Sequence, residues 1–132
     1  MPFVITPGEL EYEAGLVFVG KAYKVFLATK GSLTTASTLA QWEAAELSVA
    51  NGYEAVTGTV AAGSVNVTTG RYEAPEIAGQ FGPATSTGFT FDAMILKLAN
   101  RTKPYAVNLF AVPITLSSGQ SRGFSITLGM KP

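Results

Sequence analysis

The feature that most constrains the fold is a series of short β-rich segments separated by turn-forming residues. Gly, Ser, Thr and Asn gather in the breaks, as at Thr69-Gly70 and Ser117–Gln120, and such residues favour turns. Strands are expected at residues 21–29, 53–60, 64–68, 71–74, 89–99, 105–112 and 123–130. Strands of this length and spacing indicate a mainly β chain, folded as an antiparallel β-sandwich or a jelly-roll-like domain.

The longest expected strand, Phe89–Ala99, carries apolar residues on both faces. With side chains alternating along a strand, one face carries Phe89, Phe91, Ala93 and Ile95, and the other carries Met94, Leu96 and Leu98. This pattern predicts a central strand, or one buried at a subunit contact.

One short α-helix is expected at about residues 38–50. Thr38 and Gln41 have the spacing of a capping box, and Asn51-Gly52 suits the helix end. The apolar residues at helical spacing are Leu39, Trp42, Ala45 and Val49, with Glu43 and Glu46 facing outward. We expect Trp42 to anchor the helix against the sheet rather than to stack on a sugar.

Residues 1–15 are expected to form an N-terminal arm or a short helical turn, followed by a single β-sandwich domain at residues 16–132. Thr6 can cap a helix that has Pro7 at its first position, and Gly15 would end it. The rival interpretation is an extended arm, because glutamates alternate with Leu10 and Tyr12 at strand period.

The composition argues against catalysis. The chain contains no Cys and no His, which excludes a thiol nucleophile, a Ser-His-Asp triad and an ordinary zinc or copper site. Asp92, the single Asp, is expected to accept a hydrogen bond from a neighbouring loop or to face outward. We therefore expect no enzymatic activity, no catalytic residue, no cofactor and no metal.

The charge content limits the possible partners. Charged residues make up 14% of the 132, and nine basic residues balance nine acidic ones. The balanced charges form no basic stripe that could bind nucleic acid. The sequence also contains no run of about 18 apolar residues, so no membrane span is expected. A weakly charged surface favours association, so partner subunits are expected to cover much of it. The alternative is a neutral monomer kept soluble by its Ser and Thr hydroxyls.

The C-terminal third resembles small virion proteins of tailed bacteriophages. The strand Gly88-Phe89-Thr90-Phe91-Asp92 matches their "G-x-T-F-D" pattern. Pro113–Ser121 matches a "P-I-T-L-x-x-G-Q-[ST]" turn, and Ser125–Leu128 matches the terminal "x-I-T-L" strand. Gly63–Tyr72 also fits such proteins. The shared features are β-turn patterns, so the resemblance transfers no site residue.

The resemblance implies a virion structural protein, with a capsid decoration (cement) protein as the first expectation. A tail-fibre or baseplate component and a carbohydrate-binding β-sandwich module are the alternatives. The implied partners are the major capsid protein or tail proteins and further copies of the chain, with a trimer as one candidate oligomer. The expected contacts lie in the N-terminal arm and in the long loop Gly79–Gly88: Phe3, Ile5, Leu10, Tyr12, Phe81, Pro83 and Thr85.

Overall fold

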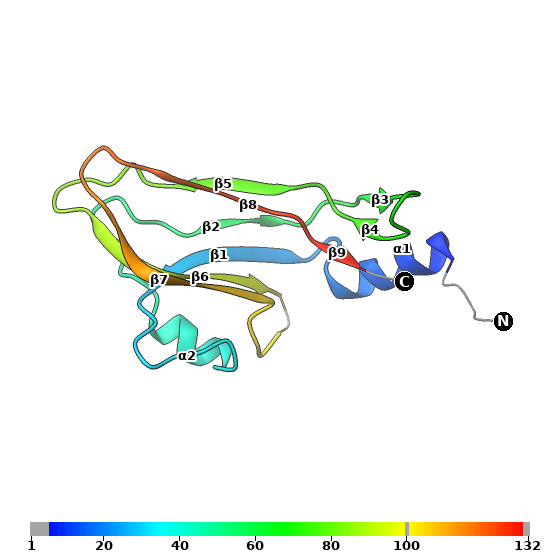
Figure 1. Cartoon of the computed structure of the whole chain (residues 1–132), viewed down its shortest axis with the longest axis horizontal. Coiled ribbons are helices and arrows are strands. Elements are labelled where there is room, and N and C mark those ends of the chain that lie inside the picture. Colours follow the sequence, from blue (N-terminus) through cyan, green and yellow to red (C-terminus); the bar gives the residue numbers. More distant parts are fainter. Residues whose placement is uncertain (1–5, 100, 131–132) are drawn as a thin grey trace. The chain divides into compact units, whose positions relative to one another are not determined.

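The structure is a computed structural model that describes residues 6–99 and 101–130. It is mainly β, with 39% strand and 13% helix, and its sheets are antiparallel, so the predicted fold class is confirmed (Figure 1). The helices are α1 (Pro7–Val17) and α2 (Leu39–Ala44). The strands are β1 (Ala22–Ala28), β2 (Val56–Thr59), β3 (Ser64–Val65), β4 (Tyr72–Glu73), β5 (Ile77–Phe81), β6 (Phe89–Leu98), β7 (Ala106–Leu116), β8 (Arg122–Ile126) and β9 (Gly129–Met130).

The chain divides into two compact units. Unit 1 contains the described residues up to Ala22, Thr59–Ala78 and the described residues from Ser125 onward. Unit 2 contains Tyr23–Gly58 and Gly79–Phe124.

Unit 2 is built on a four-stranded sheet with the order β2-β1-β6-β7. The inner strands β1 and β6 pair in a register that runs from Tyr23↔Leu98 to Ala28↔Ala93. Phe26 and Ile95 are buried on one face of this pair, in a cluster that includes Trp42. Val25, Leu27, Leu96 and Leu98 are buried on the other face. The expected central strand, with apolar residues on both faces, is therefore confirmed.

Helix α2 begins where the sequence predicted and ends earlier. The Thr38 side chain accepts a hydrogen bond from the Gln41 backbone, and the Gln41 side chain accepts one from the Thr38 backbone. The helix ends at Ala44 rather than near residue 50, because the following backbone pairs with the edge of β1. Thr29 N–H donates to Ala45 O at 3.2 Å, and Leu47 N–H donates to Leu27 O at 3.0 Å.

Two side-chain placements change with this early end. Trp42 is fully buried, as expected of an anchor, but Val49 is 78% exposed instead of packed on the helix stripe. Glu46 was expected to face outward, and it is instead partly buried in an ion pair with Lys24. The sheet competes successfully for the backbone of residues 45–47, which the helical pattern alone could not reveal.

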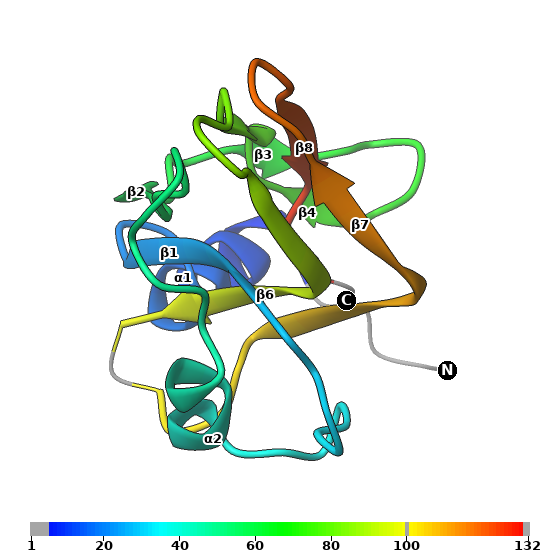
Figure 2. The same cartoon turned by 90° about the vertical axis from the view of Figure 1, so that its left-hand side faces the viewer.

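Strands β6 and β7 form a bent pair. Phe91 pairs with Ile114, but Ala93 pairs with Leu109, so Asp92 lies opposite residues 110–113 of β7. Figure 2 shows that β7 turns sharply between its first part, which pairs with the end of β6, and its last part, which pairs with the start of β6. Asp92 Oδ1 accepts a hydrogen bond from Lys30 N–H at 2.6 Å, which confirms its predicted role as the partner of a neighbouring loop.

The expected loop Gly79–Gly88 is a strand in its first part. Strand β5 extends to Phe81 and pairs with β8. A side chain at Gly79 would lie 2.9 Å from the Phe124 ring, so this glycine permits close packing and does not mark a loop. Phe81 is buried between Tyr53 and Phe124, with ring centroids 6.2 and 5.2 Å away. This aromatic layer between β-structures gives unit 2 a sandwich-like arrangement.

The segment that resembles a turn at Pro113–Ser121 also begins as strand. Strand β7 continues to Leu116, and the turn itself occupies Ser117–Gln120, where Gln120 N–H donates to Ser117 O at 2.9 Å. The expected strand at residues 123–130 is divided into β8 and β9.

Unit 1 contains α1 and the three-stranded sheet β3-β4-β9. Thr6 caps α1 by accepting a hydrogen bond from Glu9 N–H at 3.3 Å, which confirms the predicted cap. Gly15 does not end the helix, which continues to Val17. The expected break at Thr69-Gly70 is the turn of a β-hairpin, in which Val65 pairs with Tyr72.

The buried face of α1 explains why this segment is a helix and not an extended arm. Leu10, Ala14 and Phe18 recur every four residues, and all three are buried. The Phe18 ring packs on Tyr72 at a centroid distance of 6.0 Å. Glutamates alternate with Leu10 and Tyr12 at strand period, but the burial of this helical stripe decides the conformation. In the part of the chain that the structure describes, neither helix is long and apolar enough to cross a membrane.

Candidate functional site

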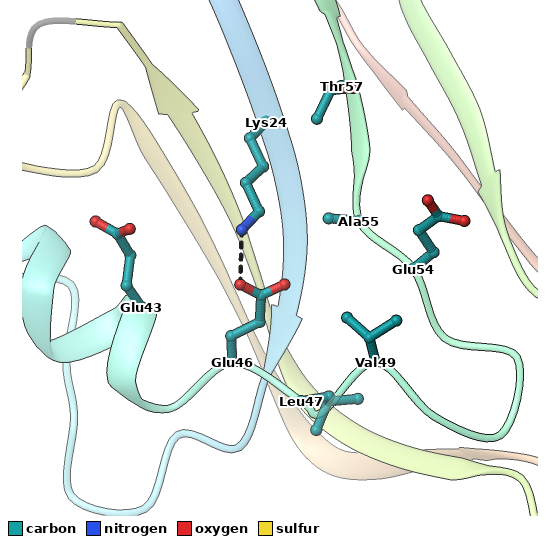
Figure 3. A pocket seen from close by; sticks show the side chains of 8 residues that line it. All are labelled: Lys24, Glu43, Glu46, Leu47, Val49, Glu54, Ala55 and Thr57. Carbon is teal, nitrogen blue, oxygen red and sulfur yellow. Dashed lines mark hydrogen bonds and ion pairs between the residues drawn. The ribbon is translucent and has the colours of Figure 1, made fainter.

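A polar hollow in unit 2 lies beside β1, between α2 and the segment leading to β2 (Figure 3). Its volume is about 430 Å³. Three carboxylates and one amine reach it, together with apolar and hydroxyl side chains. The lining residues are Lys24, Glu43, Glu46, Leu47, Val49, Glu54, Ala55 and Thr57.

Glu46 is the most constrained of these carboxylates. Its Oε1 lies 2.7 Å from Lys24 Nζ, and its Oε2 accepts a hydrogen bond from the Tyr53 hydroxyl at 2.8 Å. The Tyr53 oxygen in turn accepts a hydrogen bond from Leu27 N–H at 3.1 Å. Lys24 Nζ also lies 5.2 Å from the centre of the Phe26 ring, within the range of a cation–π contact. Both oxygens of Glu46 are therefore engaged within the chain.

The environment of Tyr53 keeps its phenol protonated. Burial raises the pKa of this phenol well above its usual value, while the hydrogen bond from Leu27 N–H acts in the opposite direction. The hydrogen bond to Glu46 and the charge of Glu46 raise the pKa further. A protonated phenol can donate to the carboxylate, so the Lys24–Glu46–Tyr53 network fixes the segment after α2 to β1.

The other two carboxylates of the hollow have different surroundings. Glu43 Oε2 lies 3.3 Å from Lys97 Nζ in an exposed ion pair, and Glu54 is exposed. Across residues 6–99 and 101–130, no group of three acidic side chains is arranged to hold a metal ion. The hollow is thus a surface depression whose best-defined polar groups stabilise the fold.

The predicted contact residues are divided between core and surface. Leu10 and Phe81 are buried within the chain, whereas Tyr12 is 64% exposed, and Pro83 and Thr85 are exposed. Leu10 and Tyr12 belong to unit 1, and Phe81, Pro83 and Thr85 belong to unit 2. Phe3 and Ile5 lie outside the described residues.

The loop that carries Pro83 and Thr85 is held by backbone hydrogen bonds. Ala84 N–H donates to Gln120 O at 2.8 Å, and Thr85 N–H donates to Asn51 O at 2.8 Å. Gly82 precedes Pro83 through a cis peptide bond and adopts a positive φ of 98°. These contacts present Pro83 and Thr85 on a defined surface.

Several exposed apolar side chains were missed by the sequence interpretation. They are Leu16, Val49, Val67 and Val112, with exposed fractions from 61% to 96%. Helical spacing could have revealed Leu16, which lies one turn after Tyr12 on the exposed side of α1. Val67 could have been recognised from its place in the hairpin turn, where Asn66 Oδ1 accepts hydrogen bonds from Thr68 N–H and Thr69 N–H.

Comparison with known proteins gives no relative. No protein-family model, no curated protein and no solved structure matches this chain.

Proposed function

We propose that this chain is a structural protein of a bacteriophage virion, and specifically a capsid decoration protein that binds the outer head shell. The observation that carries the proposal is the combination of low charge with large apolar side chains left exposed. Tyr12 and Leu16 are more than 60% exposed on α1, and Val67 is 96% exposed at a hairpin tip. Tyr12 and Leu16 are one helical turn apart and therefore neighbours on the surface of α1, and grouped exposed apolar side chains are typical of sites that a partner protein covers.

The distribution of the polar groups supports a non-enzymatic role. Glu46, the least exposed carboxylate of the hollow, is bonded to Lys24 and Tyr53 and contributes to the fold. The segment Gly88–Asp92, which resembles phage virion proteins, leads into β6 and ends at Asp92, whose hydrogen bond holds the loop after β1. The proposed partners are the major capsid protein and further copies of this chain, with no nucleic acid and no membrane.

A tail-fibre or baseplate role uses the same kind of surface, and it differs in predicting binding to phage tails instead of heads. A carbohydrate-binding module is not proposed, because that role needs a row of exposed aromatic rings. Among the tyrosines and Trp42, Tyr12 is exposed, Tyr23 and Tyr105 are half-buried, and Trp42, Tyr53 and Tyr72 are buried.

The test measures binding of the purified chain to purified phage heads and tails by co-sedimentation, with electron microscopy to locate the bound protein. Deletion of residues 1–15 is unsuitable, since it would remove the buried Leu10 and Ala14. We instead replace Tyr12 and Leu16 by Glu, which places charge on an exposed apolar surface. We expect the unaltered chain to bind to heads and the double variant to lose this binding.

The matched control is the double variant Ser32→Glu, Thr35→Glu, which adds the same two carboxylates at exposed polar positions of unit 2, away from Tyr12, Leu16 and Val67 in the sequence. The control should bind like the unaltered protein. Binding to tails but not to heads would reject the decoration role in favour of the tail alternative. A chain that binds neither particle would contradict the virion proposal.

A further inference from the structure

Strand β7 forms one edge of the four-stranded sheet of unit 2. The sheet order ends at β7, and among the described residues β6 is the strand that pairs with it. Its sequence, AVNLFAVPITL, contains no charged residue. Natural edge strands are commonly protected by charges, prolines or bulges, because unpaired backbone groups attract another strand. An uncharged edge is therefore a candidate surface for strand pairing.

The hydrogen bonds of β1 determine which backbone groups of β6 face β7. Leu27 N–H donates to Tyr53 and Leu27 O accepts from Leu47 N–H, so the backbone of Leu27 faces away from β6. Successive residues of a strand turn their backbone groups to opposite sides, so Phe26 faces β6 and its partner Ile95 faces β1. Met94 and Leu96, the neighbours of Ile95, therefore face β7.

The same alternation assigns the groups of β7. Met94 pairs with Asn108 and Leu96 pairs with Ala106, so the backbone of Asn108 and Ala106 faces β6. The N–H and C=O groups of Val107 and Leu109 then point to the outer edge. Consistent with this assignment, Tyr105 N–H donates to Leu96 O at 2.9 Å, which places that carbonyl on the β7 side.

The part of this edge that is open to another strand is short, because the bend of β7 is protected against strand pairing. Lys30 Nζ donates a hydrogen bond to Phe110 O at 3.1 Å, and Pro113 has no N–H to offer. Val107 and Leu109 lie before the bend, are half-buried, and pack on the core cluster around Trp42. The apolar core of the sheet thus extends to the open edge and is incompletely covered there.

We propose that residues 106–109 of β7 pair with the same segment of a second copy of this chain. The pairing is antiparallel, with a two-fold axis beside Asn108 and perpendicular to the sheet. Val107 of each copy lies opposite Leu109 of the other, and each such pair exchanges two backbone hydrogen bonds. The partner's Val107 and the partner's Leu109 continue the apolar surface on the α2 side, and Asn108 lies opposite its own copy.

A second copy suits this edge better than a charged partner would. The segment is neutral and apolar, so it offers no ionic attraction to a basic or acidic strand and no repulsion to itself. Asn108 is exposed, and its amide both donates and accepts, so two facing Asn side chains can bond to each other. The inference does not depend on the virion role, since the dimer can form in solution without any other protein.

Concentration-dependent amide hydrogen exchange on the full chain tests the proposal directly. Four hydrogen bonds make a small interface, and we expect weak association that increases from micromolar to millimolar protein. The amides of Val107 and Leu109 should gain protection as the protein is concentrated, in step with dimers seen by sedimentation equilibrium. Those of Ala106 and Asn108 should be protected at every concentration, because they bond to β6.

The variant Asn108→Asp places two carboxylates opposite each other at the two-fold axis. It should raise the dimer dissociation constant about fivefold, as expected for like charges directly opposite in a sheet. Asn51→Asp is the matched control, since it makes the same change at an exposed residue outside the edge. Three results would overturn the proposal. The first is a chain that stays monomeric at millimolar concentration, and the second is an equal effect of the two variants on the dissociation constant. The third is protection of the Val107 and Leu109 amides that requires a different protein and does not increase with the concentration of this chain.

Discussion

At the scale of single residues, Tyr53 links two parts of unit 2 that are distant in sequence. Its hydroxyl accepts from Leu27 N–H and donates to Glu46, and the residue is buried. Tyr53→Phe removes both bonds and leaves the Leu27 N–H without this partner. We expect a loss of about 1–3 kcal/mol in the free energy of unfolding, measured by urea denaturation. Tyr12→Phe, the same change on an exposed ring, should alter it by less than about 0.5 kcal/mol; equal losses would contradict the assigned role.

The raised pKa of Tyr53 also predicts how stability depends on pH. In the unfolded chain the phenol loses its proton near pH 10.0, its usual pKa, whereas the folded chain keeps that proton to higher pH. The folded state then binds more protons than the unfolded state, so its stability decreases with pH in this window. The contribution is fully present below pH 10.0 and is lost above it.

The measurement is the urea midpoint of the unaltered protein and of Tyr53→Phe between neutral pH and pH about 11. The midpoint of the unaltered protein should fall more steeply above pH 10.0. Subtracting the two curves removes the titration that the other tyrosines contribute. If the urea midpoints of the two proteins changed in parallel with pH throughout the range, Tyr53 would not be the source of this pH dependence.

At the scale of elements, α2 depends strongly on its first turn. The helix has six residues, and the Thr38–Gln41 capping box satisfies donors at its start. Thr38→Ala removes the hydroxyl that accepts from Gln41 N–H and should cost about 0.5–2 kcal/mol in unfolding free energy. Thr38→Ser, which keeps a hydroxyl, should retain most of that stability. Urea unfolding followed by Trp42 fluorescence measures both, and equal stability of the Ala and Ser variants would contradict the prediction.

The same helix illustrates what the sequence could and could not predict. Its start is encoded locally, in residues three positions apart, and was predicted correctly. Its end is imposed by backbone bonds between Leu47 and Leu27 and between Ala45 and Thr29, which no helical pattern contains. The loop predicted from Gly79 onward was wrong in its first part for a similar reason. Gly79 lies in β5, where the absence of a side chain leaves room for the Phe124 ring, which is distant in the sequence.

The polar network was missed for the same reason. Lys24 and Glu46 are 22 positions apart, and their pairing depends on how the chain returns to β1 after α2. Alternation within β6 was a stronger signal, since its burial on both faces follows from the ten residues of the strand itself. Features encoded by nearby residues were therefore predicted, together with the burial of Trp42 and the loop contact of Asp92, but the Lys24–Glu46 pair and the backbone pairing that ends α2 were not.

At the scale of the whole molecule, neutrality and exposed apolar groups should act together on solubility. The chain has no net charge, so charge repulsion does little to oppose association through side chains such as Val49 and Val67. We expect the double variant Val49→Lys, Val67→Lys to need more polyethylene glycol for precipitation at pH 7. Its unfolding free energy should stay within about 0.5 kcal/mol of the original, because both side chains are exposed.

The control for this prediction separates charge from apolar surface. Thr57→Lys with Thr68→Lys adds the same two positive charges at exposed positions and leaves Val49 and Val67 in place. If the apolar groups are surface that a partner covers, the valine variant should gain distinctly more solubility than the threonine variant. Equal gains would mean that net charge alone limits solubility, and the exposed valines would then no longer support a surface built to be covered.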